Sequence, residues 1–283
     1  MAKERHRLQH KHLTPLRDHL YASISADEIL DRYIQPQPKS KNENAETFLK
    51  RIRDSAAKYQ FVKIHFENQS YFVAFGVSGP IITPRGTFTA VPAQVVGGTW
   101  GTHYILIYPD LGKVLNGKSI HLRLDSGCYS GMVLGDVSCD CKNQLEKSQA
   151  LCVKNNGGII IHTPGHDGRG WGDYKLANQR IMNELHVDTV TAARLFYESE
   201  EEIDQRTYFE SALIIKALGI TEKHHLELAT NNPDKISAFR SLNMHISTIS
   251  PLIPEDISSL ALQNLKAKSQ HWNHNLGKSH SNK

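Results

Sequence analysis

Three of the four cysteines are spaced in a way that could bind one metal ion. Cys139 and Cys141 are one residue apart, and ten residues separate Cys128 from Cys139. Three thiolate ligands would leave the fourth position of a tetrahedral site open to water, as in a catalytic zinc site. Zinc-bound water ionises near neutral pH and is then a usable nucleophile. The spacing is equally compatible with buried free thiols, because cysteine often packs as a small hydrophobe.

The fourth cysteine, Cys152, falls inside a helix that the pattern predicts for residues 145–154. We interpret Cys152 as a core residue; as a fourth ligand it would instead close the site and make it structural. All four cysteines are clustered, and the N-terminus lacks the apolar segment of a secretory signal. Metal ligands or free thiols fit this better than a disulfide framework, so we expect a cytoplasmic protein.

Three further motifs carry groups that suit an anionic ligand. Asp167-Gly168-Arg169-Gly170 combines glycines, which let a ligand approach the backbone, with the planar fork of an arginine. Asp204-x-Arg206 pairs opposite charges, and Thr230-Asn231-Asn232-Pro233-x-Lys235 ends in a lysine. Taken singly, each has an ordinary alternative: a common Gly-rich loop, a solvated ion pair and an Asn-Pro turn.

The whole chain has the composition of an ordinary globular protein. Among its 283 residues, 33 Lys and Arg face 29 Asp and Glu, a formal net charge of +4. This small excess does not favour a dedicated nucleic-acid binder, but it suits a pocket for a polyanionic small molecule. No apolar run approaches the length needed to cross a bilayer. We therefore expect neither nucleic acid nor a membrane as a partner.

Hydrophobic patterning places these motifs in an α/β architecture. Strand patterns occur at residues 87–91, 103–108, 119–124, 159–161 and 225–229, and helix patterns at 145–154, 173–184 and 208–218. Strands that alternate with helices from residue 119 onward are typical of an α/β sheet. The helix at 145–154 ends before Asn155-Asn156-Gly157-Gly158, residues that tolerate the left-handed conformation after a C-cap.

The ends of the chain have a different character. Residues 1–43 are polar, with one short helix expected near 26–34. Apolar residues at a spacing of four predict an amphipathic helix over 44–58, and two apolar runs at 61–66 and 71–75 predict a hairpin. We divide the chain into an N-terminal extension (1–78), a main domain (79–272) and a polar tail (273–283) that we expect to fray.

In order and spacing, these motifs together resemble the GTP cyclohydrolase II family. Cys139-Asp140-Cys141-x-x-Gln144-Leu145 is similar to its Cys-Asp-Cys-Gly-x-Gln-Leu block, and Asp167-Gly168-Arg169-Gly170 to its Glu-Gly-Arg-Gly loop. Its Thr-Pro-x-Gly, Asp-Thr-Val and Leu-Thr-Asn-Asn-Pro-x-Lys elements have counterparts at 82–88, 187–190 and 229–235. The resemblance covers roughly residues 80–272. It implies a mixed α/β sheet covered by helices, with the N-terminal helix and hairpin as an extension.

The resemblance also assigns roles to individual residues. It implies that Cys128, Cys139 and Cys141 bind one zinc ion per chain. It implies that Asp204 is a proton acceptor and Arg206 the nucleophile on the α-phosphate; charge stabilisation is an equally good physical role, because guanidinium is normally protonated. The implied substrate-binding positions are Arg123, Ser126, Gln144, Asp167, Gly168, Arg169, Thr189, Thr230 and Lys235.

The reaction implied by the resemblance is the zinc-dependent opening of a purine ring. Water attacks C8 of GTP or a related purine nucleotide, and formate, pyrophosphate or both are released. Mg²⁺ would accompany the phosphates, and the family forms homodimers. Two other interpretations stay open: a catalytically altered nucleotide-binding relative or a hydrolase for a different nucleotide, and a zinc-stabilised interaction module if Cys152 is a ligand.

Several positions depart from the family pattern. Gly127 stands where the family has Glu, Asp125 where it has His, and Ser138 where it has Arg. Asp167 replaces Glu, and Arg180 falls at the position of the active-site Tyr. General acid–base help is worth roughly two to four orders of magnitude in rate. We therefore predict a divergent member in which the second hydrolysis is slowed and a formamidopyrimidine product accumulates.

Overall fold

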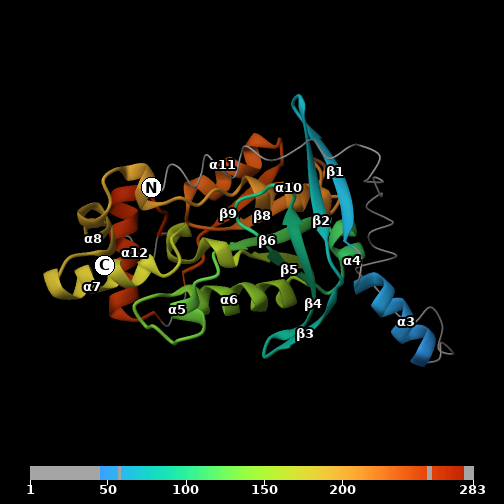
Figure 1. The fold of residues 1–283 in the computed structure, drawn as a ribbon, viewed down its shortest axis with the longest axis horizontal. Helices are drawn as coiled ribbons and strands as arrows, with labels where there is room; N and C mark the ends of the chain where they lie inside the picture. The colour runs from blue at the N-terminus through green and yellow to red at the C-terminus, as the bar shows by residue number, and fades with distance from the viewer. Residues whose placement is uncertain (1–44, 57–58, 254–256, 277–283) are drawn as a thin grey trace.

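The computed structural model describes residues 45–56, 59–253 and 257–276. These residues form a nine-stranded sheet in the order β1-β2-β4-β5-β7-β6-β8-β9, with β3 paired to β4 beside this path (Figure 1). Neighbouring strands are antiparallel from β1 to β7 and parallel among β7, β6, β8 and β9. The predicted α/β class with a mixed sheet is therefore confirmed.

The strand bounds agree with the predicted ones where the sequence is strongly apolar. The strands are β1 (Gln60–Phe66), β2 (Gln69–Phe75), β3 (Gly79–Thr83), β4 (Gly86–Val95), β5 (His103–Tyr108), β6 (Ser119–Asp125), β7 (Gly158–His162), β8 (His225–Ala229) and β9 (Ile246–Ser250). The strand predicted at 87–91 is extended to residue 95. The prediction missed β3 and β9, which are mostly exposed or half-buried and therefore give weak apolar signals.

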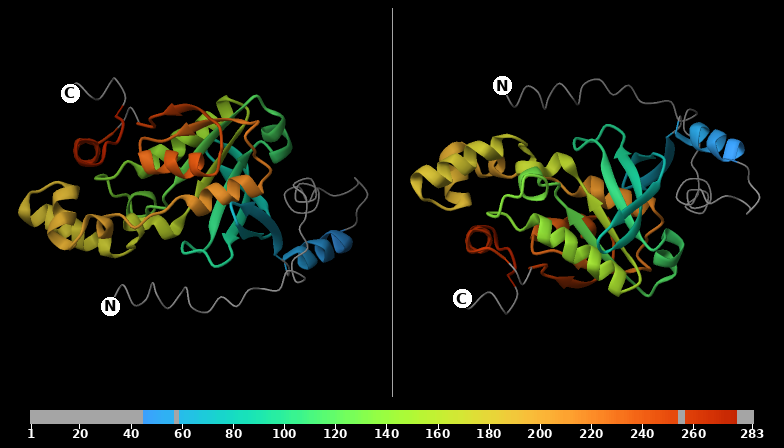
Figure 2. Two further views of the ribbon diagram at one scale, coloured as in Figure 1. Left: turned by 90° about the horizontal axis from the view of Figure 1, so that it is seen from above. Right: turned by 90° about the horizontal axis from the view of Figure 1, so that it is seen from below.

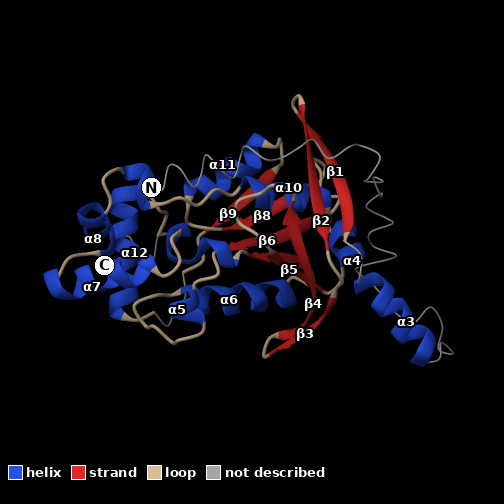
Figure 3. Cartoon of the chain, viewed as in Figure 1, coloured by secondary structure: helices blue, strands red, loops and turns tan. Residues whose placement is uncertain are grey.

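Helices lie on both faces of the sheet (Figures 2 and 3). They are α3 (Ala45–Ala56), α4 (Leu111–Asn116), α5 (Tyr129–Met132), α6 (Cys141–Lys154), α7 (Tyr174–Leu185), α8 (Thr189–Phe196), α9 (Glu200–Ile203), α10 (Phe209–Ala217), α11 (Pro233–Ser241) and α12 (Ser259–Trp272), with a 3-10 segment η3 (Pro164–Gly170). The four helices predicted at 44–58, 145–154, 173–184 and 208–218 correspond to α3, α6, α7 and α10. The short helix expected near residues 26–34 lies outside the described residues.

Side chains on the two faces of the sheet belong to different apolar cores. The larger core joins Leu122 of β6 and Ile161 of β7 to Leu213 of α10. The smaller core joins Ile160 of β7 to Cys152 of α6, together with Phe88 and Leu106. Cys152 is fully buried there, as predicted for a core residue.

The two ends of the described chain are connected to the main fold. The predicted N-terminal hairpin is formed by β1 and β2, and β2 pairs with β4, so the sheet continues across the predicted boundary at residue 78. Near the C-terminus, Leu276 is buried against Ile253 and Leu265, so the packed structure extends beyond residue 272. Residues 277–283 lie outside the described part. Within that part, no helix is both long and apolar enough to cross a membrane.

The parallel strands position the predicted motifs. β6 ends at Asp125, β7 at His162 and β8 at Ala229, and all three run in the same direction. Their carboxyl ends therefore meet at one edge of the sheet, where ligands commonly bind in α/β folds. The segments that follow carry Cys128, the Gly-rich loop and Thr230. The tertiary fold thus gathers motifs that are about 100 residues apart.

Candidate active site

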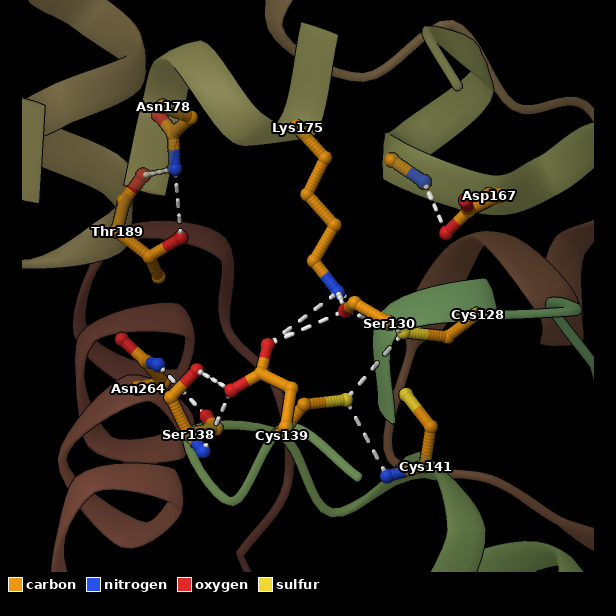
Figure 4. A network of polar contacts seen from close by, with 12 residues as sticks. Cys128, Ser130, Ser138, Cys139, Cys141, Asp167, Lys175, Asn178, Thr189 and Asn264 are labelled. Carbon is orange, nitrogen blue, oxygen red and sulfur yellow. Dashed lines mark hydrogen bonds and ion pairs between the residues drawn. The ribbon is translucent and has the colours of Figure 1, made fainter. Parts of the chain in front are cut away.

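Three cysteine sulfurs form a cluster at this edge of the sheet (Figure 4). The Sγ atoms of Cys128, Cys139 and Cys141 all lie within 4.8 Å of one another, and those of Cys128 and Cys139 are 3.5 Å apart. Gly131 makes this packing feasible, because a Cβ at that position would lie only 2.9 Å from Cys139 Sγ. Sulfurs bound tetrahedrally to zinc at ~2.3 Å would be about 3.8 Å apart. The donor set and its spacing therefore fit a metal ion.

The cluster contains one strongly acidic thiol. Hydrogen bonds from Cys139 and Cys141, followed by the charge of Lys175, hold the pKa of Cys128 well below its ordinary value. The same hydrogen bond raises the pKa of Cys139 to about 11. The backbone N–H of Cys141 also donates to Cys139 Sγ over 3.4 Å. Negative charge is thus concentrated on Cys128, the sulfur nearest to a cation.

That cation is Lys175, which projects from α7 toward the cluster (Figure 4). Its Nζ donates to Cys128 Sγ over 3.0 Å and to Ser130 Oγ, and it lies 3.9 Å from Asp136 Oδ2. Asp136 in turn accepts a hydrogen bond of 2.9 Å from the backbone N–H of Ser138. This network ties α7 to the loop that connects the cysteines. The sequence motifs did not identify Lys175 as a site residue.

The cysteine cluster forms part of the wall of a larger pocket. This pocket encloses about 840 Å³ of space, part of it open to solvent. The sequence-predicted residues that line it are Ser126, Cys128, Cys139, Cys141, Gly168, Arg169, Thr189 and Arg206. The pocket wall also contains residues that the prediction missed, including Tyr174, Lys175, Asn178, Asn264 and Lys268.

Asp204 and Arg206 form a two-pronged ion pair at the pocket. Arg206 Nε donates to Asp204 Oδ1 over 2.8 Å, Arg206 Nη2 donates to Asp204 Oδ2, and Arg206 Nη1 reaches Ser126 Oγ at 3.3 Å. Burial alone would raise the pKa of Asp204, but the charge and hydrogen bonds of Arg206 outweigh it and lower the pKa. Burial would likewise lower the pKa of Arg206, but nearby Tyr208 and Asp204 raise it. Arg206 therefore presents a fixed positive charge.

Arg169 is held by a second group of contacts. Its backbone is left-handed, with φ of 64°, and its Nη2 donates to Thr189 Oγ1 over 2.6 Å. Asn178 Nδ2 donates to the same Thr189 oxygen over 3.2 Å. Asp188 caps α8 by accepting from the N–H groups of Val190 and Thr191, which fixes Thr189 at the start of that helix. Burial, followed by the charge of Arg206, lowers the pKa of Arg169 to about 10.

Four of the predicted substrate-binding residues lie beneath the pocket and are not among its lining residues. Arg123, Gln144, Thr230 and Lys235 are all buried. Arg123 donates to Gln144 Oε1 and to the carbonyl oxygen of Ala229, the latter over 3.2 Å. Lys235 Nζ donates to the carbonyl oxygen of Leu124 over 2.7 Å. These contacts connect the ends of β6 and β8 and the start of α6.

The positions that depart from the family pattern have varied surroundings. Asp167 accepts a hydrogen bond of 2.8 Å from the N–H of Gly168 and is not among the residues that line the pocket. Arg180 pairs with Glu184 at 2.8 Å, and its side chain is 78% exposed, so it does not take the place of an active-site Tyr. Asp125 accepts from His162 Nδ1 over 2.6 Å, so an imidazole from the neighbouring strand stands beside it.

Two pairs of the lining residues that the prediction missed have a helical spacing. Tyr174 and Asn178 are four residues apart on α7, and Asn264 and Lys268 are four apart on α12. Residues at this spacing lie on the same face of a helix. The spacing is visible in the sequence, but it does not reveal that these faces meet the pocket.

Comparisons with known proteins are consistent with this site. A family model described as GTP cyclohydrolase II matches residues 80–251. The riboflavin biosynthesis protein RibBA of Chlamydia muridarum is 27% identical over 226 residues, covering 74% of this chain and 52% of that protein. The chloroplastic monofunctional riboflavin biosynthesis protein RIBA 3 of Arabidopsis thaliana is 32% identical over 150 residues, covering 51% and 28%. RibBA of Aquifex aeolicus is 30% identical over 164 residues, covering 57% and 39%. The chain spans about half or less of the length of these relatives.

Proposed function

Because the chain belongs to the GTP cyclohydrolase II family, we propose that it is a hydrolase that opens the imidazole ring of GTP or a related purine nucleotide. One observation carries this proposal above the others. The three cysteines that could bind a metal ion and Arg206, whose guanidinium is paired with Asp204, line the same pocket. The first can serve hydrolysis at a ring carbon, and the second can serve chemistry at a phosphate.

Cys128, Cys139 and Cys141 would hold one zinc ion. Zinc bound there supplies a Lewis acid and lowers the pKa of water enough to make it a nucleophile at C8. The contacts among Arg169, Thr189 and Asn178 give the pocket a wall of fixed polar groups that can orient the purine.

Arg206 and Asp204 would act at the phosphate end. The paired carboxylate keeps the guanidinium in place, so its charge need not reorganise as negative charge develops on the α-phosphate. Asp204 stays ionised because Arg206 lowers its pKa, and it can accept a proton. We propose that water attacks the α-phosphate and loses a proton to Asp204, that pyrophosphate leaves with Mg²⁺ bound to the phosphates, and that Arg206 stabilises the charge on the phosphoryl group.

The second hydrolysis, which removes the formyl group, has less support from the pocket. The family's Glu position is Gly127, and its Tyr position is Arg180, which is 78% exposed. Neither position therefore supplies an acid or base to the pocket. We propose that the enzyme opens the ring and releases a formamidopyrimidine faster than it releases formate.

The test is to incubate the zinc-loaded protein with GTP and identify the products by mass spectrometry, with formate and pyrophosphate measured in parallel. We expect the formamidopyrimidine to accumulate, and Cys139→Ser to abolish its formation. Stoichiometric formate with a fully deformylated product would show that another group completes the reaction. An intact purine ring, despite tight binding of GTP, would support the alternative of a nucleotide-binding relative.

We also propose that the protein forms a homodimer, as its family does. Several large apolar side chains in the segment between Cys128 and Ser138 are more than half exposed: Tyr129, Val133, Leu134 and Val137. An exposed apolar group of this kind is typical of a protein interface. Sedimentation at micromolar concentration should give the mass of two chains, and a monomer would contradict the proposal.

A further inference from the structure

The C-terminal helix α12 is fixed to the cysteine-bearing loop. Ser258, at its N-cap, donates to the carbonyl oxygen of Val137. Asn264 Nδ2 donates to the carbonyl oxygen of Ser138 over 2.9 Å (Figure 4). On its inner side, Leu265 is buried and packs in the small cluster that includes Ile253. The first half of α12 is therefore held directly beside the candidate metal centre.

The other end of α12 is fixed to the Gly-rich loop and to α8. The guanidinium of Arg169 lies 4.8 Å from the ring centroid of Trp272, within range for a cation–π contact. Arg194 Nη1 of α8 donates to His271 Nδ1 over 3.0 Å. α12 therefore spans the pocket from the cysteine loop to the Gly-rich loop. It lies beyond residue 251, where the match to the family model ends.

Lys268 is the basic residue of α12 that lines the pocket, on the same wall as Asn264. Its position at i+4 from Asn264 places both side chains on the face that meets the pocket. Among the described residues, the Lys268 ammonium has no carboxylate within ion-pair distance and no hydrogen-bond acceptor; the backbone carbonyl oxygen of Lys268 accepts from the N–H groups of Asn273 and His274. Lys268 is half-buried and lines the cavity, so its ammonium can contact an anion bound there.

The surroundings of Lys268 are also positively charged. Arg169 and Arg206 line the same pocket, and only Arg206 has a carboxylate partner, Asp204. The ring of His274 lies within reach of these charges. Burial first, and then the charges of Lys268, Arg206 and Lys235, lower the pKa of His274 to about 3. Lys175 also lines the pocket, and of these four lining cations only Arg206 and Lys175 have a carboxylate partner among the described residues. Such an excess of positive charge favours a ligand that carries several negative charges.

We propose that Lys268 binds the phosphates beyond the α-phosphate of the substrate, so that α12 selects a nucleoside triphosphate over a monophosphate. This inference rests on the proposed function, which assigns the α-phosphate to Arg206. Lys268 has three rotatable N–H donors on a flexible stem, which suits phosphate groups whose position varies. The pocket wall formed by α12 is then a binding element that the family match does not cover.

The test compares GTP, GDP and GMP binding to the zinc-loaded protein at constant Mg²⁺. Binding is followed by stopped-flow tryptophan fluorescence within milliseconds, before turnover. The variant is Lys268→Gln, with Lys266→Gln as the matched control on the same helix, because Lys266 does not line the pocket. Loss of a charge-assisted contact should raise the Kd for GTP about 10- to 100-fold. The Kd for GMP should change less than about twofold, and Lys268→Arg should restore most of the GTP affinity.

The outcomes separate this inference from the function on which it rests. If Lys268→Gln leaves the Kd for GTP unchanged, or weakens GTP and GMP equally, the assignment of Lys268 is wrong although GTP remains the ligand. If Lys266→Gln weakens GTP as much as Lys268→Gln does, the effect is one of general charge and the assignment is again wrong. If the wild-type protein binds none of the three nucleotides, the proposed function itself fails together with this inference.

Discussion

Lys175 Nζ lies 3.0 Å from Cys128 Sγ, so an ammonium group of α7 contacts the most acidic sulfur of the cysteine cluster. Three thiolates around one divalent cation carry a net negative charge, which Lys175 can compensate. Groups that hydrogen-bond to metal ligands typically contribute about 10- to 100-fold to metal affinity. We therefore expect Lys175→Met to raise the Kd for zinc by about that factor, measured by competition with a chromophoric chelator.

A matched control for this prediction lies on the same helix. Arg180 is exposed and contacts Glu184, so Arg180→Met removes a positive charge without touching the cluster. Its Kd for zinc should equal that of the wild type. Cobalt substituted for zinc gives a second measurement, since the thiolate-to-cobalt absorption should shift in Lys175→Met only. Equal zinc affinity in both variants would contradict a role for Lys175 at the metal centre.

The cysteines should divide into three ligands and one core residue. Cys139→Ser should lose the metal, because thiolates dominate the affinity of such a site. Cys152→Ala should retain one zinc ion per chain, since Cys152 packs with Phe88 and Ile160 in an apolar cluster. Zinc content by elemental analysis measures both. Loss of zinc from Cys152→Ala, in a chain that keeps its circular dichroism spectrum, would contradict an open three-cysteine site.

Replacing Arg206 should separate phosphate chemistry from metal binding. Arg206→Ala removes the positive charge at the pocket, so pyrophosphate release should fall by about 100-fold or more, the magnitude typical for loss of one electrostatic stabiliser. Zinc content should stay at the wild-type value. A coupled pyrophosphate assay and elemental analysis measure the two effects.

The variant Arg206→Lys distinguishes the two roles considered for this residue. It keeps the charge but loses the two-pronged contact with Asp204. Partial pyrophosphate release by Arg206→Lys would support charge stabilisation. Complete loss in Arg206→Lys, together with a covalent phosphoryl adduct in the wild type, would support a nucleophilic role instead.

His103 should make the stability of the fold depend on pH. It is fully buried at the start of β5, and burial lowers its pKa from 6.5 to about 4. Below pH 6.5 the unfolded chain binds a proton that the folded chain does not, so the free energy of unfolding falls as the pH drops toward 4. The slope is about 1.4 kcal/mol per pH unit, which amounts to about 2 kcal/mol between pH 6.5 and 5.

Urea denaturation of the wild type and His103→Gln at pH 7 and pH 5 measures this contribution. The variant lacks the titrating ring. The amount by which its free energy of unfolding falls below that of the wild type should therefore be about 2 kcal/mol smaller at pH 5 than at pH 7. An equal difference at both pH values would show that His103 is protonated in the folded state. Other acid-sensitive groups, including the cysteine cluster, are shared by both chains and cancel in the comparison.

The sequence by itself determined the cysteine cluster, the ion pair and the central strands. Cys139 and Cys141 are almost adjacent, and Asp204 and Arg206 are separated by one residue, so short-range geometry brings these groups together. The strands β5, β6, β7 and β8 are apolar and mostly buried, and they therefore give a clear pattern. These features depend on neighbours in the chain or on strong burial.

Only the tertiary structure decided which helical faces meet the pocket. α7 has no buried residue, so its apolar residues do not mark an inner face, and Lys175 reaches Cys128 across 47 positions of the chain. The sequence likewise does not show that Lys268 faces the pocket, because the orientation of α12 is set by its contacts with Ser138 and Arg169. Arg123 and Lys235, predicted at the substrate, are buried beneath the pocket because their donors bind carbonyl oxygens at the ends of neighbouring strands. The direction in which a polar side chain points depends on packing between distant elements, and residue type and spacing do not encode that packing.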